Sequence, residues 1–180
     1  MLAQQTGRLT LFMTSSMLPE LARNEGNVRL ELARHLRKLD DSVDIAADCL
    51  KLCGSPIVTV SLANSQLQAH LGAKYAAFVD ACEVLDDDYN AKSRAMDRVV
   101  GQVRPSRKGS ALDANIIEHY FGLGGELRHI GLGQPFVFVS SNTEDYCEAG
   151  ALHADLTVEF RALGLAYTST LPWATKALGL

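Results

Sequence analysis

The chain has 180 residues, with a hydrophobic fraction of 47%, a charged fraction of 21% and a formal net charge of −4 at pH 7. These values are ordinary for one folded domain and exclude a disordered or low-complexity chain. The negative charge also argues against the broadly basic surface with which proteins bind nucleic acids non-specifically.

The first half of the chain is predicted to contain one strand followed by helices. Leu9 to Thr14 is short, apolar and β-favouring. Apolar residues then recur at helical spacing, which predicts one helix from Glu20 to Leu39 and a second over Ser42 to Leu52. Ile57 to Ser61 fits either a strand or an extended connector, and Leu62 to Val84 is rich in alanine and leucine, as a helix would be.

The second half alternates helices with apolar strands. A helix is expected to resume after the acidic residues 86–88 and to end near Val100, before a loop that contains several basic residues. The next helix should begin at Ser110 and weaken at the glycines that follow Phe121. The remaining expected elements are a strand over Pro135–Ser140, a turn or short helix over Asn142–Glu148, a helix over Leu152–Leu163 and a strand over Leu165–Ser169.

Strands separated by helices predict an α/β fold. We expect one domain over residues 1–180, built as three layers with an open, mostly parallel sheet between helices, in the manner of Rossmann-like folds. The nearly continuous apolar run of Pro135 to Ser140 supports this expectation, because parallel strands are buried on both faces.

Three acidic residues lie at predicted junctions between strands and helices. Glu20 follows the first strand, Asp113 lies in the first turn of its helix, and Asp145 follows the strand that ends at Ser140. In open parallel sheets, sites form beyond the carboxyl ends of the strands, so these three carboxylates are expected to converge. Convergent carboxylates stay ionised together when a cation lies among them, and oxygen ligands suit Mg²⁺ or Mn²⁺.

Each acid also has a purely structural interpretation. Ser110 and Asp113 have the spacing of a capping box, and so do Asn142 and Asp145. Glu20 could equally be a solvated residue in the first turn of its helix, where a negative charge is favourable.

Two runs in the second half resemble the carboxyl-terminal part of PIN-like domains. They are Lys108-Gly-Ser-Ala-Leu-Asp113-Ala-Asn-Ile-Ile-Glu118 and Phe136-Val-Phe-Val-Ser-Ser-Asn-Thr-Glu-Asp145-Tyr. The earlier run Leu11-Phe-Met-Thr-Ser-Ser-Met-Leu-Pro-Glu20-Leu resembles the second strand and following helix of the same family. The resemblance extends from about Leu9 to about Leu171.

The resemblance implies a metal-dependent endoribonuclease. Glu20, Asp113 and Asp145 would be catalytic residues that bind Mg²⁺ or Mn²⁺. Ser141, Asn142 and Lys108 would contact the RNA substrate or shape the site, although Lys108 could also be an ordinary solvated loop residue. Many PIN-like proteins are toxins with an antitoxin partner. The alternative is a PIN-like module that has lost catalysis and binds protein or RNA.

The amino terminus departs from the PIN-like pattern. Members of the family usually open with an apolar strand that ends in Asp, whereas Met1 to Arg8 contains neither feature and resembles the end of a helix that closes at Gly7. We therefore expect an N-terminally incomplete domain with weak or no nuclease activity. A missing central strand would leave backbone groups unpaired, so the chain should be poorly stable or form a homodimer.

No segment has the features of a membrane or secreted protein. Met1 to Arg8 lacks the basic and apolar regions of a signal peptide, and no run approaches the roughly 18 apolar residues of a membrane span. The four cysteines contain no Cys-x-x-Cys pair and are interpreted as small apolar residues. We expect a cytoplasmic protein without membrane contact.

Overall fold

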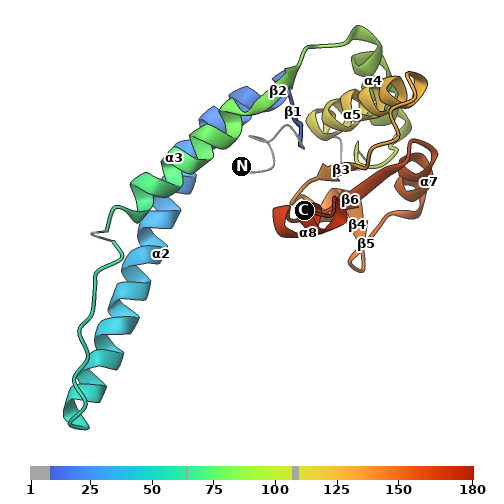
Figure 1. The fold of residues 1–180 in the computed structure, drawn as a ribbon. Helices are drawn as coiled ribbons and strands as arrows, with labels where there is room; N and C mark the ends of the chain where they lie inside the picture. The colour runs from blue at the N-terminus through green and yellow to red at the C-terminus, as the bar shows by residue number, and fades with distance from the viewer. Residues whose placement is uncertain (1–8, 64, 107–109) are drawn as a thin grey trace. The chain divides into compact units, whose positions relative to one another are not determined.

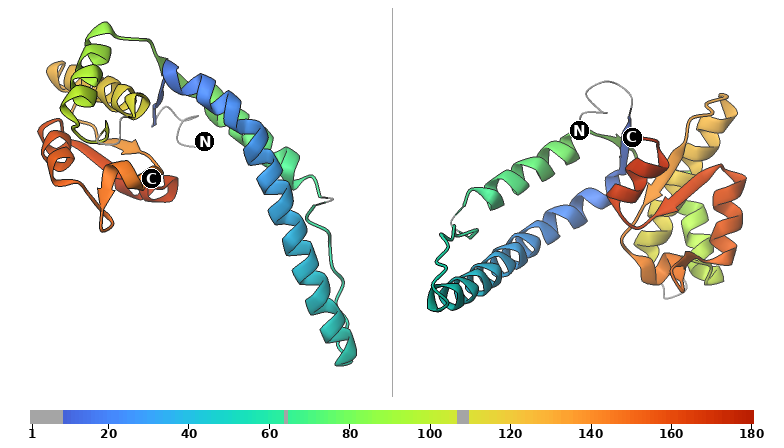
Figure 2. Two further views of the ribbon diagram at one scale, coloured as in Figure 1. Left: turned by 180° about the vertical axis from the view of Figure 1, so that it is seen from behind. Right: turned by 60° about the horizontal axis from the view of Figure 1, so that its bottom comes forward.

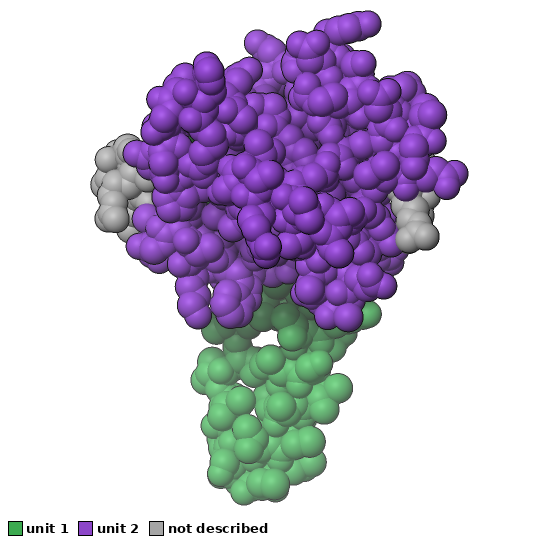
Figure 3. Space-filling model, turned by 90° about the vertical axis from the view of Figure 1, so that its right-hand side faces the viewer, with its two compact units in different colours: residues 1–11, 18–83 green, residues 12–17, 84–180 purple. Residues whose placement is uncertain are grey.

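The structure is a computed structural model that describes residues 9–63, 65–106 and 110–180. The chain divides into two compact units (Figure 3). Unit 1 comprises residues 1–11 and 18–83, and unit 2 comprises residues 12–17 and 84–180. The expectations for Met1 to Arg8 and for Lys108 fall outside the described residues.

Helices predominate among the elements of the chain (Figure 1). The helices are η1 (Ser15–Met17), α2 (Leu18–Leu52), α3 (Leu67–Asp80), α4 (Tyr89–Gly101), α5 (Ala111–His129), α6 (Thr143–Tyr146), α7 (Ala154–Ala162) and α8 (Leu171–Ala177). The strands are β1 (Leu11–Thr14), β2 (Cys82–Leu85), β3 (Phe136–Val139), β4 (Cys147–Glu148), β5 (Ala151–Leu152) and β6 (Leu165–Thr168).

The sequence-based prediction of a three-layer sheet is wrong. Within the described residues the strands form three separate two-stranded sheets, which pair β1 with β2, β3 with β6 and β4 with β5. Only the β3–β6 pair is the expected parallel arrangement, with Phe136 opposite Leu165 and Val139 opposite Thr168. Strand-like sequences at 11–14, 136–139 and 165–168 were recognised correctly, but their periodicity carries no information on how many strands share one sheet.

α2 is one continuous helix, where the sequence predicted two. The expected break at Asp40 and Asp41 contains neither glycine nor proline, so nothing in the backbone chemistry ends the helix there. Pro19 is the second residue of α2, where its missing N–H costs no hydrogen bond.

The connector after α2 is held against that helix by one carboxylate. Asp40 accepts hydrogen bonds from the backbone N–H groups of Leu62 (2.7 Å) and Ala63 (2.9 Å) and from Ser61 Oγ (2.7 Å). The hydrogen bonds from Ala63 and then Ser61 lower the pKa of Asp40. Residues 55–61 are therefore an extended connector rather than a strand, and α3 then runs back along α2 (Figures 1 and 2).

Tertiary contacts override local preference at two other predicted helices. The helix expected over Leu62–Val84 is limited to α3, because Cys82–Leu85 forms β2 and pairs with β1. The helix expected to weaken after Phe121 continues to His129 instead. Close packing explains the glycine at position 124 of this helix, because a Cβ atom there would lie 3.3 Å from Cδ2 of Leu165.

The core of unit 2 is rich in aromatic residues. Phe138 of β3 lies at its centre, with ring centroids 5.2 Å from Tyr120 of α5, 5.4 Å from Tyr146 of α6 and 5.9 Å from Phe160 of α7. The buried cluster comprises Ile117, Tyr120, Phe121, Phe138, Tyr146, Leu156, Phe160 and Leu165. This packing fixes the start of α5 and the segment after β3 relative to each other.

The β4–β5 hairpin contains a strained residue, and replacing it should stabilise unit 2. Ala149 and Gly150 form the two-residue turn with φ of 50° and 82°, which a side chain at Ala149 disfavours. We expect Ala149→Gly to raise the free energy of unfolding by about 1 kcal/mol. Gly150→Ala should lower it by a similar amount, and thermal denaturation of both variants measures the two effects. Equal melting temperatures for all three proteins would contradict the prediction.

Candidate functional site

The first acid of the site is positioned by the amino terminus of α5. Ser110 is the N-cap residue, and its Oγ accepts a hydrogen bond from the backbone N–H of Asp113 at 3.3 Å. The same hydroxyl donates to Oδ2 of Asp113. The capping interpretation of this pair is therefore confirmed, and the cap also orients the carboxylate.

Asn142 joins Asp113 and Asp145 of unit 2. Its Nδ2 donates to Oδ1 of Asp113 at 3.3 Å and to Oδ2 of Asp145 at 2.9 Å. Asn142 is the N-cap residue of α6, yet among the described residues its side chain makes no capping hydrogen bond to that helix. The Asn142–Asp145 pair therefore connects two carboxylates, and the simple capping interpretation is wrong for it.

One oxygen of this cluster has no partner. Oδ1 of Asp145 is buried and accepts no hydrogen bond from any residue that the structure describes. A buried carboxylate oxygen without a donor is costly, so such an atom points to a ligand that the protein itself does not supply. A divalent cation or an ordered water molecule would satisfy it.

The buried side chain of Tyr146 contacts the segment that carries Asp113. Its side chain is 1% exposed, its hydroxyl donates to the backbone carbonyl of Asp113 at 3.4 Å, and its ring stacks on Tyr167 at 6.0 Å. Burial, and after it the negative charge of Asp113, raises the pKa of Tyr146. The phenol therefore stays neutral and keeps its role as a donor to the segment that carries Asp113. The only sequence signal for this residue was an aromatic position directly after Asp145.

A small cavity opens beside Asp113. Its volume is about 70 Å³, which is comparable to the space of about two water molecules. Residues from η1, α5, β3 and α6 line it, among them Met17, Asp113, Ile116, Phe138, Ser140 and Tyr146. The cavity therefore has one carboxylate in its wall and mostly apolar side chains around it.

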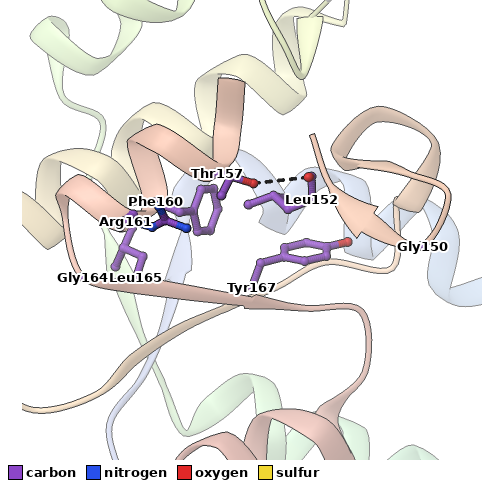
Figure 4. Close-up of a pocket in the computed structure, with 8 residues that line it drawn as sticks. All are labelled: Gly150, Leu152, Thr157, Phe160, Arg161, Gly164, Leu165 and Tyr167. Atoms are coloured by element: carbon purple, nitrogen blue, oxygen red, sulfur yellow. Dashed lines mark hydrogen bonds between the residues drawn. The ribbon is translucent and has the colours of Figure 1, made fainter. Parts of the chain in front are cut away.

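A larger cavity of about 480 Å³ lies elsewhere in unit 2, between α7, β6 and the β4–β5 hairpin (Figure 4). Thr157 Oγ1 donates to the carbonyl of Leu152 at 3.2 Å along its wall. The described residues that line it are Gly150, Leu152, Thr157, Phe160, Arg161, Gly164, Leu165 and Tyr167, and none of them is acidic. Of these two cavities, only the smaller one therefore has a carboxylate among its described lining residues.

The remaining predicted site residues within the described ranges are Glu20 and Ser141. Glu20 lies in the first turn of α2 and belongs to unit 1, whereas Asp113, Asn142 and Asp145 belong to unit 2. Ser141 is exposed, and its backbone carbonyl accepts the N–H of Thr143 at 2.9 Å. The structure therefore brings together the second and third predicted acids with Asn142.

Asp113 and Asp145 meet part of what the binding of a hard divalent cation requires. Two carboxylates, one of them with an unpartnered oxygen, provide the oxygen chemistry that Mg²⁺ and Mn²⁺ prefer. Over residues 9–63, 65–106 and 110–180, however, no three His, Cys, Asp or Glu side chains come close enough to hold a metal ion. Asp113 and Asp145 would thus hold such an ion together with water molecules.

Replacing the bridging amide by a carboxylate should make the stability of unit 2 depend on cations. In Asn142→Asp, three carboxylates would repel one another, and we expect the melting temperature in EDTA to fall by several degrees, the equivalent of about 1–2 kcal/mol. Millimolar Mn²⁺ should restore it. Ser141→Asp adds the same charge at the neighbouring exposed position and should show a much smaller response. Equal responses of the two variants would contradict the bridging geometry.

None of the described helices is long and apolar enough to span a membrane. Comparison of the chain with models of protein families, with curated proteins and with solved structures found no match in any of the three.

Proposed function

We propose that the protein is a metal-dependent endoribonuclease whose site is formed by Asp113, Asn142 and Asp145. The observation that carries the proposal is the buried, unpartnered Oδ1 of Asp145 beside a second carboxylate. The ordered motifs that resemble PIN-like domains support it independently, because they contain these same three residues.

The chain's own residues prepare the two carboxylates for this chemistry. The Ser110 hydroxyl, at the amino terminus of α5, fixes one of the oxygens of Asp113. Tyr146 anchors the backbone of Asp113, and Asn142 holds the two carboxylates at a fixed separation. A bound Mg²⁺ or Mn²⁺ would supply a water of lowered pKa and stabilise negative charge on a phosphodiester. Lys108 is proposed to contribute a phosphate contact.

The direct test is cleavage of a structured RNA by the purified protein. We expect slow product formation in Mn²⁺ or Mg²⁺ and none in EDTA, with activity restored when the cation is added back. Product ends should be those of hydrolysis, with no dependence on any other cofactor. RNA that stays intact at micromolar enzyme in both cations would contradict the proposal.

A binding module without catalysis is the second candidate. It is favoured by the finding that, in the described part of the chain, no third acidic side chain completes the cluster. This alternative predicts RNA or protein binding that is independent of divalent cations, so electrophoretic mobility shifts in EDTA separate the two functions.

A further inference from the structure

α2 is exposed over most of its surface, including a side that carries three large apolar residues. Leu30, Ile45 and Leu52 have exposed fractions of 59%, 67% and 89%. They belong to a stripe whose members recur every three or four residues, with Ile45 directly after Asp44, and all of them lie on one side of the helix. The stripe, which we call the α2 stripe, comprises Leu30, Arg34, Arg37, Asp41, Asp44, Ile45, Asp48 and Leu52.

The rest of unit 1 packs on a different side of α2. Asp40 binds the connector, and the carbonyl of Arg29 accepts a long hydrogen bond of 3.5 Å from Gln68 of α3. On a helix with 3.6 residues per turn, Arg29 and Asp40 lie a quarter of a turn or more from the centre of the α2 stripe. Thr59 of the connector donates a hydrogen bond of 3.4 Å to Asp44 of the stripe.

The charges of the α2 stripe are ordered along the helix. The basic residues Arg34 and Arg37 precede Asp41, and the acidic residues Asp44 and Asp48 follow it. Counted from Asp41, the order is nearly symmetrical with opposite sign. Arg34 and Asp48 are each seven residues away, and Arg37 and Asp44 are four and three residues away.

This order matches a second, antiparallel copy of the same helix. We propose that the chain forms a two-fold symmetric dimer through the α2 stripe, centred near Asp41. Arg34 then lies opposite Asp48 of the other copy, and Arg37 lies opposite Ile45, one residue from Asp44. The exposed Leu30 and Leu52 are each eleven residues from the centre, so they also come opposite each other and bury apolar surface. A parallel pair would instead place like charges opposite each other.

The free chain gives α2 little support of its own. Among the described residues of α2 and α3, only Leu36 is buried. Helices depend mainly on tertiary packing of an apolar face, and two hairpins joined through a shared seam form the layout of a four-helix bundle. A second copy therefore supplies the packing that unit 1 lacks.

Charge exchange along the α2 stripe tests both the contact and its direction. The mass of the full chain in solution is measured by light scattering and sedimentation equilibrium. We expect a dimer for the unmodified chain and at least tenfold weaker association for Arg34→Asp with Arg37→Asp. Asp44→Arg with Asp48→Arg should weaken association equally. The chain that carries all four substitutions has the original amino-acid composition. In an antiparallel dimer of this variant every opposite-charge pair is present again, so we expect it to dimerise.

Three results would overturn the proposal. The first is a monomer for the unmodified chain at about 100 µM, and the second is a dimer whose association neither pair of substitutions weakens. The third is a fourfold variant that does not dimerise although circular dichroism shows that it is helical. Asp41 provides a further check, because it meets its own copy at the symmetry axis. Asp41→Asn should therefore tighten the dimer, and a weaker dimer would contradict the register. None of these measurements depends on nuclease activity, so the proposed function and the dimer are tested separately.

Discussion

Glu118→Ala should destabilise the protein by about 3–5 kcal/mol, because it would remove the buried one of the two carboxylates that pair with a buried guanidinium. The Glu118 side chain is 5% exposed and pairs through Oε1 with Nε of Arg98, whose side chain is 8% exposed. Arg98 also bonds Glu159 of α7 and the backbone carbonyl of Arg104. Burial by itself would lower the pKa of Arg98, but its hydrogen bonds to Glu159 and Glu118 raise it, so the charge persists in the core.

Arg94→Ala is the matched control for this network. Arg94 donates from Nε to the other oxygen of Glu118 at 2.7 Å, but its side chain is 45% exposed and water can replace it. We expect a loss below about 1 kcal/mol for this variant. Urea denaturation followed by circular dichroism measures both changes. If the two substitutions cost the same, the buried pair does not have the structural role described for it.

Asp145→Asn should reduce metal-dependent RNA cleavage by roughly 100-fold or more, a loss typical of removing one electrostatic group from a catalytic site. The substitution keeps the size of the side chain and the position of α6, and it removes the charge beside the unpartnered Oδ1. Asp113→Asn should have a comparable effect because its Oδ1 shares the Asn142 amide with Asp145. The measurement is the initial cleavage rate at several Mn²⁺ concentrations.

Asp155→Asn controls for the general effect of removing a helix-start aspartate. Asp155 lies in the first turn of α7, and its Oδ1 accepts the backbone N–H of Leu156 at 2.9 Å. This variant should cleave RNA at the unmodified rate. Melting temperatures of the three variants should lie close together, which shows that activity is lost without unfolding. Cleavage by Asp145→Asn at the unmodified rate would exclude this residue from the chemistry.

The sequence predicted the centre of the candidate site better than it predicted the fold. Asp113 and Asp145 were expected together because one begins a helix and the other follows a buried strand, and these local features survive in α5 and β3. The bridging geometry of Asn142 was not predictable, because capping and bridging need the same residue types at the same spacing. Only the structure shows which groups the amide meets.

Long-range contacts explain where the other predictions failed. The pairing of Cys82–Leu85 with β1 and the packing of Gly124 against Leu165 join residues that are far apart in the chain, so no local pattern contains them. The buried Arg98–Glu118 pair spans two helices and leaves no periodic signal, since single charged residues occur throughout α4 and α5. The single parallel sheet was wrong for the same reason, because strand propensity is local and strand pairing is not.

The amide of Asn142 has a consequence for how the protein matures. Many small metal proteins cannot fold until their ion arrives, because the ligands repel one another or lack any other partner. Here the side-chain amide of Asn142 donates one hydrogen bond to Asp113 and one to Asp145, and these two bonds already hold the carboxylates in place. Under the proposed function, folding would therefore not have to wait for the ion, and the metal-free protein would be folded but inactive.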